Sequence, residues 1–137
     1  MQPAGGPSAG DVYDALVSFA FVRDLDAAQQ FYIGQLGLEL VTDQGACRIY
    51  RVAEGGFLGL CTHRPPTPPD AVILTLVRND VEEFCEQLAA RGVEFEKSPT
   101  HNSRFGITQA FLRDPDGNLV EIQRFDDTEW SRPISAG

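Results

Sequence analysis

Two stretches of the chain repeat one pattern, and this internal repeat restricts the fold more than any other feature. The first copy runs LVSFAFV and then DLDAAQQFYIGQLGLEL, and the second runs AVILTLV and then NDVEEFCEQLAARGVEF. Each copy ends in a glycine turn that leads into a short strand, EGGFLGLC in the first and DPDGNLVEIQ in the second. A twofold repeat of this kind builds two equivalent walls around one cleft, so residues at matching places decide the chemistry.

Each copy is predicted to have the element order βαβββ. Alternating apolar residues with β-branched and aromatic content indicate an opening strand at 16–22 and again at 72–77. Three further strands are expected in each copy, at 38–43, 46–52 and 56–61, and then at 93–97, 105–113 and 118–124.

One helix follows the opening strand of each copy. The first begins at Asp24 and the second at Asn79 or Asp80, which are residues that cap helix N-termini. Apolar residues recur at helical spacing in both, which predicts one buried face on each helix. Gly37 and Gly92 end the two helices, because glycine tolerates the positive φ of a helix C-terminus.

The expected fold is α+β: two βαβββ modules form a cup-shaped mixed or antiparallel sheet around one cleft, with the helices outside. A single domain is expected at 13–125, with modules at 14–62 and 71–125, a proline-rich linker at 63–70, and tails at 1–12 and 126–137. The N-terminal tail is rich in Gly, Pro and Ala and is expected to be disordered. The C-terminal tail, with Trp130, docks either on the body or on a partner subunit; the sequence leaves both open.

The charge balance argues against two classes of partner. The chain has 20 acidic and 11 basic residues, a net charge of −9, so nucleic acid and anionic membrane surfaces would be repelled. No stretch approaches the ~20 apolar residues that span a bilayer, and the first residues do not resemble a secretory signal. Three cysteines without a CxxC pair predict free thiols and a cytoplasmic location, with Cys85 as core filler.

The segments DLDAAQQFYIGQLGLEL and DPDGNLVEIQ resemble signature segments of the vicinal-oxygen-chelate superfamily. That superfamily includes glyoxalase I, extradiol dioxygenases, epimerases, fosfomycin-modifying transferases and bleomycin-sequestering proteins. The resemblance covers about 14–125, nearly the whole predicted domain. It implies the fold and says little about the reaction, because one fold hosts many functions.

Metal-using members of the superfamily place a ligand in the first and last strand of each copy, usually His and then Glu. The corresponding positions in this sequence are Val17, Gly59, Ile73 and Glu121. One glutamate cannot supply the three or more N or O ligands that a divalent metal site needs. No metal and no other cofactor is therefore expected at these positions. The two histidines, His63 and His101, fall in predicted loops.

Strand alternation predicts which other side chains share the cleft face with these four positions. They are Phe19, Phe21, Phe57, Cys61, Thr75, Val77, Leu119 and Gln123. An apolar, aromatic-walled pocket with a few polar points is typical of a small-molecule site. The phenylalanines either stack on a planar ligand or pack against one another and close the cavity, and both interpretations stand.

Glu121 carries the sharpest chemistry of the predicted cleft. On an apolar wall its pKa would rise toward the range of a general base, whereas an ion pair with Arg48, Arg51 or Arg104 would keep it ionised and inert.

Three other predicted cleft residues are polar or thiol-bearing. In the loop before the seventh strand, His101 and Arg104 are either ligand contacts or part of a solvated turn. Cys61 has no histidine placed by the sequence to activate it, so nucleophilic catalysis is not expected.

The resemblance and the residues together predict a metal-free protein of the glyoxalase/bleomycin-resistance type that binds a hydrophobic or aromatic small molecule. The related resistance proteins work as dimers, which implies a homodimer here. The alternative is a glyoxalase-like lyase or isomerase, or a dioxygenase, with Glu121 as general base or metal ligand. A third interpretation is a domain that has lost its pocket and acts through its dimer surface.

Overall fold

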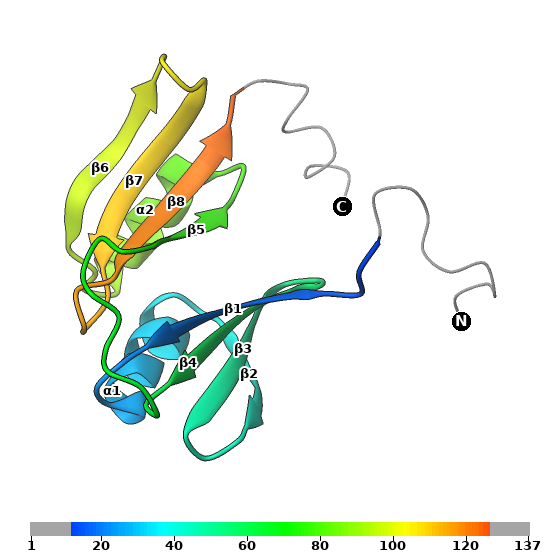
Figure 1. The fold of residues 1–137 in the computed structure, drawn as a ribbon. Helices are drawn as coiled ribbons and strands as arrows, with labels where there is room; N and C mark the ends of the chain where they lie inside the picture. The colour runs from blue at the N-terminus through cyan, green and yellow to red at the C-terminus, as the bar shows by residue number, and fades with distance from the viewer. Residues whose placement is uncertain (1–11, 127–137) are drawn as a thin grey trace.

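The computed structural model describes residues 12–126, which form two four-stranded sheets (Figure 1). The first sheet has the order β1-β4-β3-β2 and the second the order β5-β8-β7-β6. Their bounds are Leu16–Phe21 for β1, Glu39–Asp43 for β2, Cys47–Ala53 for β3, Gly56–Cys61 for β4, Ile73–Val77 for β5, Phe95–Asn102 for β6, Ile107–Arg113 for β7 and Leu119–Phe125 for β8. In each sheet the first strand pairs parallel with the fourth and the other pairs are antiparallel. The predicted α+β fold with two βαβββ modules is confirmed. The predicted tails lie almost entirely outside the described residues.

Both predicted helices are present, and the first changes its winding partway. Helix α1 (Leu25–Gln29) continues directly into the π-helical η1 (Gln30–Gln35), where the sequence predicted one regular helix. The carboxylate of Asp24 accepts hydrogen bonds from the backbone N–H groups of Asp26 and Ala27, which confirms this N-cap. Helix α2 (Val81–Ala90) begins after Asp80, whose side chain makes no capping bond.

One apolar core serves both modules. It joins the buried faces of both helices to the side chains that each sheet turns toward them, and its largest fully buried members are Tyr32, Tyr50, Leu60, Leu88, Leu112 and Ile122. Because neighbouring residues on a strand point to opposite faces, Leu58 and Leu60 of β4 enter this core while Phe57, Gly59 and Cys61 lie on the other face. The predicted site residues therefore occupy the sheet faces that point away from the helices.

A buried polar contact joins the first module to the turn between β7 and β8. The hydroxyl of Tyr32 donates to the Asp114 carboxylate at 2.7 Å. The same carboxylate accepts the backbone N–H groups of Asp116 and Asn118 and the side-chain amide of Asn118. Burial, with the negative charge of Asp114 beside it, raises the pKa of Tyr32 far above its usual range. The DPDGN segment thus organises its own turn and ties the two modules together.

Strand β6 is longer than the sequence predicted. It continues to Asn102, so His101 lies in a strand and not in a loop; this prediction was wrong.

Two hydrogen bonds hold the proline-rich linker against β1. The backbone N–H of Thr67 donates to the carbonyl of Phe21 at 2.9 Å, and the Thr67 hydroxyl accepts from the backbone N–H of Phe21 at 2.8 Å. None of the helices in the described range has the length and apolar character needed to cross a membrane.

Candidate functional site

The strand register places the predicted site residues in two sets, one on each sheet. In the first sheet Phe19 pairs with Gly59 and Phe21 with Cys61, across the parallel strands β1 and β4. In the second sheet Thr75 pairs with Glu121, across β5 and β8. Gln123 is the next residue of β8 on the same face. The structure therefore groups Phe19, Phe21, Phe57 and Cys61 on one sheet, and Thr75, Glu121 and Gln123 on the other.

Glu121 is held by neutral donors. Its side chain is buried, and one carboxylate oxygen accepts from the Thr75 hydroxyl at 2.7 Å. The other oxygen accepts from the side-chain amides of Gln123, at 3.1 Å, and Gln109. Three hydrogen bonds satisfy most of what an ionised carboxylate needs when it leaves water. This arrangement suits an orienting hydrogen-bond acceptor better than a base poised to take a proton.

The arginines considered as partners of Glu121 contact other groups. Arg48 pairs with Asp26 at 3.0 Å, and Arg51 pairs with Glu39 at 3.1 Å. Arg104 lies over the ring of Phe105. The ion-pair interpretation of Glu121 is therefore not realised in the structure. Sequence reasoning missed Gln109; it could have been found by counting alternate residues along β7, the neighbour of β8.

Phe19 occupies the space above Gly59. A Cβ built at Gly59 would lie 2.5 Å from Cε1 of Phe19 and 3.1 Å from Cδ1 of Ile49. The Phe19 ring therefore lies against the bare backbone of β4, and 52% of the residue stays exposed. Gly59 is one of the four positions at which the superfamily resemblance predicted metal ligands, and its lack of a side chain makes room for an aromatic ring.

The four positions do not fit a divalent metal ion. Val17 and Ile73 carry only hydrocarbon side chains, and Gly59 carries none. Glu121 alone offers oxygen, and its oxygens already accept three hydrogen bonds. Since a metal site in such a fold needs at least three N or O ligands, this donor set cannot build one.

Two hollows border the candidate residues. A cavity of about 580 Å³ lies on the second sheet, lined by Glu121, Gln123, Gln109 and several apolar side chains, with Phe105 and Phe111 among them. A second cavity of about 340 Å³ lies between the modules and is lined by Phe57 and Thr75, among other residues. Phe19, Phe21 and Cys61 line neither hollow. The structure therefore does not bring all the predicted residues into one pocket of a single chain.

His101 and Arg104 lie near the rim of the larger hollow. The Nδ1 of His101 lies 2.9 Å from the carboxylate of Asp126, which also accepts from Arg124 and Thr108. Arg104 is exposed, and its backbone N–H donates to the side chain of Asn102, which lines the hollow. Neither residue contacts Glu121 in the interactions found. Both stay predicted ligand contacts.

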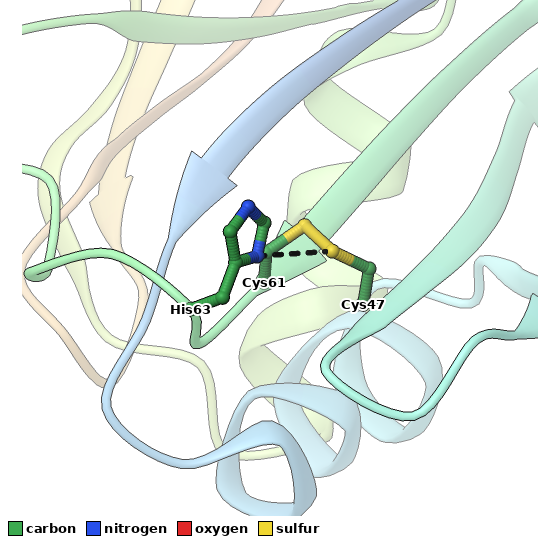
Figure 2. Close-up of side chains that lie close together, drawn as sticks. All are labelled: Cys47, Cys61 and His63. Atoms are coloured by element: carbon green, nitrogen blue, oxygen red, sulfur yellow. Dashed lines mark hydrogen bonds between the residues drawn. A yellow bond between two sulfur atoms is a disulfide. The ribbon is translucent and has the colours of Figure 1, made fainter.

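Two of the cysteines form a disulfide, which corrects the prediction of free thiols. Cys47 on β3 is bonded to Cys61 on β4, and of the described cysteines only the buried Cys85 is free. The sequence predicted no histidine near these sulfurs, but the Nδ1 of His63 lies 3.5 Å from the sulfur of Cys47 (Figure 2). The register of the β3–β4 hairpin, with Cys47 opposite Cys61, was the signal that could have found the bond.

The fold is one of two paired βαβββ modules, with large apolar side chains exposed on the sheet faces. The chain belongs to the Glyoxalase/Bleomycin resistance protein/Dioxygenase superfamily, whose family model matches residues 14–122.

Three solved structures show that other proteins share this fold. TnmS3, an antibiotic binding protein from Streptomyces sp. CB03234, is 29% identical with a TM-score of 0.68, over 83% of this chain and 97% of that one. A lactoylglutathione lyase from Agrobacterium tumefaciens is 22% identical with a TM-score of 0.66, over 81% and 92%. A glyoxalase/bleomycin resistance protein/dioxygenase from Nocardioides is 18% identical with a TM-score of 0.68, over 84% of both chains. An enzyme and an antibiotic binder share this fold, so the fold does not choose between them.

Proposed function

We propose that the protein binds a hydrophobic or aromatic small molecule on the apolar sheet faces, without a metal ion at the site. The observation that carries the proposal is the half-exposed ring of Phe19 packed against the backbone of Gly59. Phe19 covers Gly59, and Glu121 is engaged by Thr75, Gln109 and Gln123. The likeness to TnmS3, described as an antibiotic binding protein, supports the same class of ligand.

The two faces would divide the work of binding. Phe19, Phe21 and Phe57 would supply stacking and apolar contact, which give affinity without covalent chemistry. Glu121 and Gln123 would orient the ligand, because both line the cavity of about 580 Å³. A few polar groups on an apolar wall are the usual composition of such a site.

A homodimer would complete the cleft. The exposed faces carry large apolar side chains, with 52% of Phe19, 53% of Ile73 and 63% of Phe105 accessible in one chain. Ile73 and Phe105 both line the cavity of about 580 Å³, and an exposed apolar patch of this kind marks an interaction surface. A second chain that lays its Phe19 face over the hollow beside Glu121 would bring the two sets of site residues together. We therefore propose a ligand site shared between two copies of this chain.

A direct binding experiment tests this function. A panel of planar aromatic antibiotics is screened by thermal shift, and each hit is measured by calorimetry against the chelator-treated wild type. Phe19→Ala should weaken binding at least tenfold, and Val41→Ala, an exposed apolar residue on another strand, should not. Binding that depends on added metal would contradict the proposal.

Glu121→Gln separates a binder from an enzyme. The amide keeps the shape and the hydrogen-bonding oxygen of the side chain, so ligand affinity should change only a few-fold. The contradicting outcome is that wild type converts the ligand to a product, whereas the variant binds the ligand normally and does not convert it. Glu121 would then act as a base, and the pure-binding proposal would fail. Sedimentation at several protein concentrations, with and without ligand, tests the dimer.

A further inference from the structure

Two sulfur atoms and an imidazole meet at one end of the first sheet. Figure 2 shows Cys47 and Cys61 bonded to each other with the ring of His63 turned toward them. One ligand atom from each residue can be chosen so that all three lie within 4.8 Å of one another. None of these residues occupies the positions of Val17, Gly59, Ile73 or Glu121, so this sulfur cluster is a separate site.

The sheet keeps the two cysteines adjacent whether or not they are bonded. Cys47 and Cys61 are direct partners in the antiparallel ladder, with their Cα atoms 4.1 Å apart. The N–H of Thr62 donates to the carbonyl of Ala46 at 2.9 Å, so the neighbouring pair is the hydrogen-bonded one. The cysteines therefore form a non-hydrogen-bonded pair, in which side chains lie closest together. Breaking the disulfide leaves two thiols side by side.

His63 is positioned by contacts of its own. Its ring packs edge-on against Phe21, with centroids 5.4 Å apart and planes at 78°. The linker that carries it is tied to β1 by the two hydrogen bonds between Thr67 and Phe21. The Nδ1 atom then stands 3.5 Å from the sulfur of Cys47. Strands β3 and β4 and the linker thus each contribute one donor.

We propose that in the reduced protein Cys47, Cys61 and His63 bind a thiophilic cation, with Zn²⁺ as the representative ion. Two thiolates and an imidazole are the ligands that such ions select. Tetrahedral zinc, with Zn–S near 2.3 Å and Zn–N near 2.0–2.1 Å, places a sulfur and a nitrogen roughly 3.5 Å apart and two sulfurs roughly 3.8 Å apart. The sulfur–nitrogen spacing is already present between Cys47 and His63. The sulfurs reach theirs by side-chain rotation once the S–S bond is broken.

Oxidation and metal binding exclude each other at this cluster. A phosphine reductant cleaves the disulfide by taking up oxygen from water to become a phosphine oxide, and the two protons of that water convert the sulfurs to two thiols. The cation then displaces the thiol protons as it binds the two thiolates. Three protein ligands leave a fourth coordination position open, the arrangement that accepts water or another donor.

Cobalt substitution tests the site directly. Full-length protein reduced with tris(2-carboxyethyl)phosphine is titrated with Co²⁺ and then with Zn²⁺. We expect one equivalent of Co²⁺ to give thiolate charge-transfer absorption and intense visible bands of tetrahedral cobalt, which Zn²⁺ abolishes. Protein left in the disulfide form should give neither signal.

Variants decide which residues bind. His63→Ala should weaken Co²⁺ binding at least tenfold, and because His63 is exposed this variant is expected to fold. Cys47→Ser and Cys61→Ser should lose the charge-transfer band, with circular dichroism confirming that each is folded. Cys85→Ser is the matched control and should bind as wild type. A reduced wild type without these bands, or a Cys61→Ser variant with the wild-type spectrum, overturns the proposal.

Discussion

The aromatic ring of Phe19 lies directly over the backbone of Gly59, at a place where any larger residue would meet it. The two residues are partners across β1 and β4, so the contact is built into the register of the first sheet. Ile49 borders the same space from β3. The absence of a side chain at Gly59 leaves the space that the Phe19 ring occupies.

Gly59→Ala should therefore disturb ligand binding more than folding. The new Cβ would lie 2.5 Å from Cε1 of Phe19, and the half-exposed ring can swing out to relieve the clash. We expect overpacking to cost about 1–2 kcal/mol in urea unfolding. Affinity for the aromatic ligand should fall at least fivefold by calorimetry. Gly56→Ala on the same strand is the control, because its nearest neighbour lies 3.9 Å away. Equal affinities in the two variants would contradict this role of Phe19.

Removing a donor from Glu121 should destabilise the folded protein. Thr75→Val keeps the shape of the side chain and deletes the hydroxyl that donates to the buried carboxylate at 2.7 Å. Losing one hydrogen bond to a buried charged group should lower the free energy of unfolding by about 1–3 kcal/mol. Thr100→Val removes an exposed hydroxyl bonded to the Ser98 carbonyl and should cost about 0.5 kcal/mol or less. Chemical denaturation at neutral pH measures both. A Thr75→Val change no larger than that control would show that Glu121 does not need this donor.

Asp126 should make the protein sensitive to acid. Burial acts to raise the pKa of its carboxyl group, but hydrogen bonds from Arg124, Thr108 and His101 prevail and lower it. A pKa that is lower in the folded state adds stability above the unfolded value, near pH 4, and this stability is lost as the pH falls through the folded pKa. Asp126→Asn should be less stable at pH 7 by about 1–2 kcal/mol. The gap to wild type should close below pH 4 in urea titrations.

The control for Asp126 is Glu54→Gln, which removes one exposed charge in a turn. A gap between wild type and Asp126→Asn that stays constant from pH 7 to pH 3 would contradict the linkage.

Cys85 should be chemically silent in the native protein. Its thiol is buried on α2, and burial, with smaller contributions from Glu82 and Asp80, raises its pKa to about 11. Roughly one thiol in a thousand is then ionised at pH 8, and the thiolate is the reactive form. We expect a disulfide-exchange reagent to label native protein in the disulfide form slowly, and to label one thiol at once in denaturant. Rapid labelling of the native protein that disappears in Cys85→Ser would refute this.

The elements that the sequence predicted best are those governed by local rules. Alternation predicted which residues of β1, β4, β5 and β8 share a face. Asp24 caps its helix as its residue type predicts, and Gly37 adopts a φ of 81°. These outcomes depend on backbone geometry within a few residues, which the sequence displays directly.

The features that the sequence missed depend on contacts between distant segments. The disulfide requires the hairpin register that places Cys47 opposite Cys61, and the role of Gln109 requires that β7 lie beside β8. The extension of β6 to Asn102 depends likewise on its pairing with β7, which composition does not reveal. The sequence suggested arginines as partners of Glu121, because opposite charges pair. In the structure two neutral side-chain amides and one hydroxyl donate to its carboxylate.

The contact between Tyr32 and Asp114 couples the folding of the two repeats. Each repeat has its own sheet and helix, but Tyr32 of the first repeat donates to Asp114 in the β7–β8 turn of the second. Side chains of both repeats also pack in one common core. A fragment with only the second repeat would lack the Tyr32 hydroxyl that donates to Asp114, and either repeat alone would expose core side chains to water. Denaturation by heat should therefore proceed in one step, as if the duplication had never been two domains.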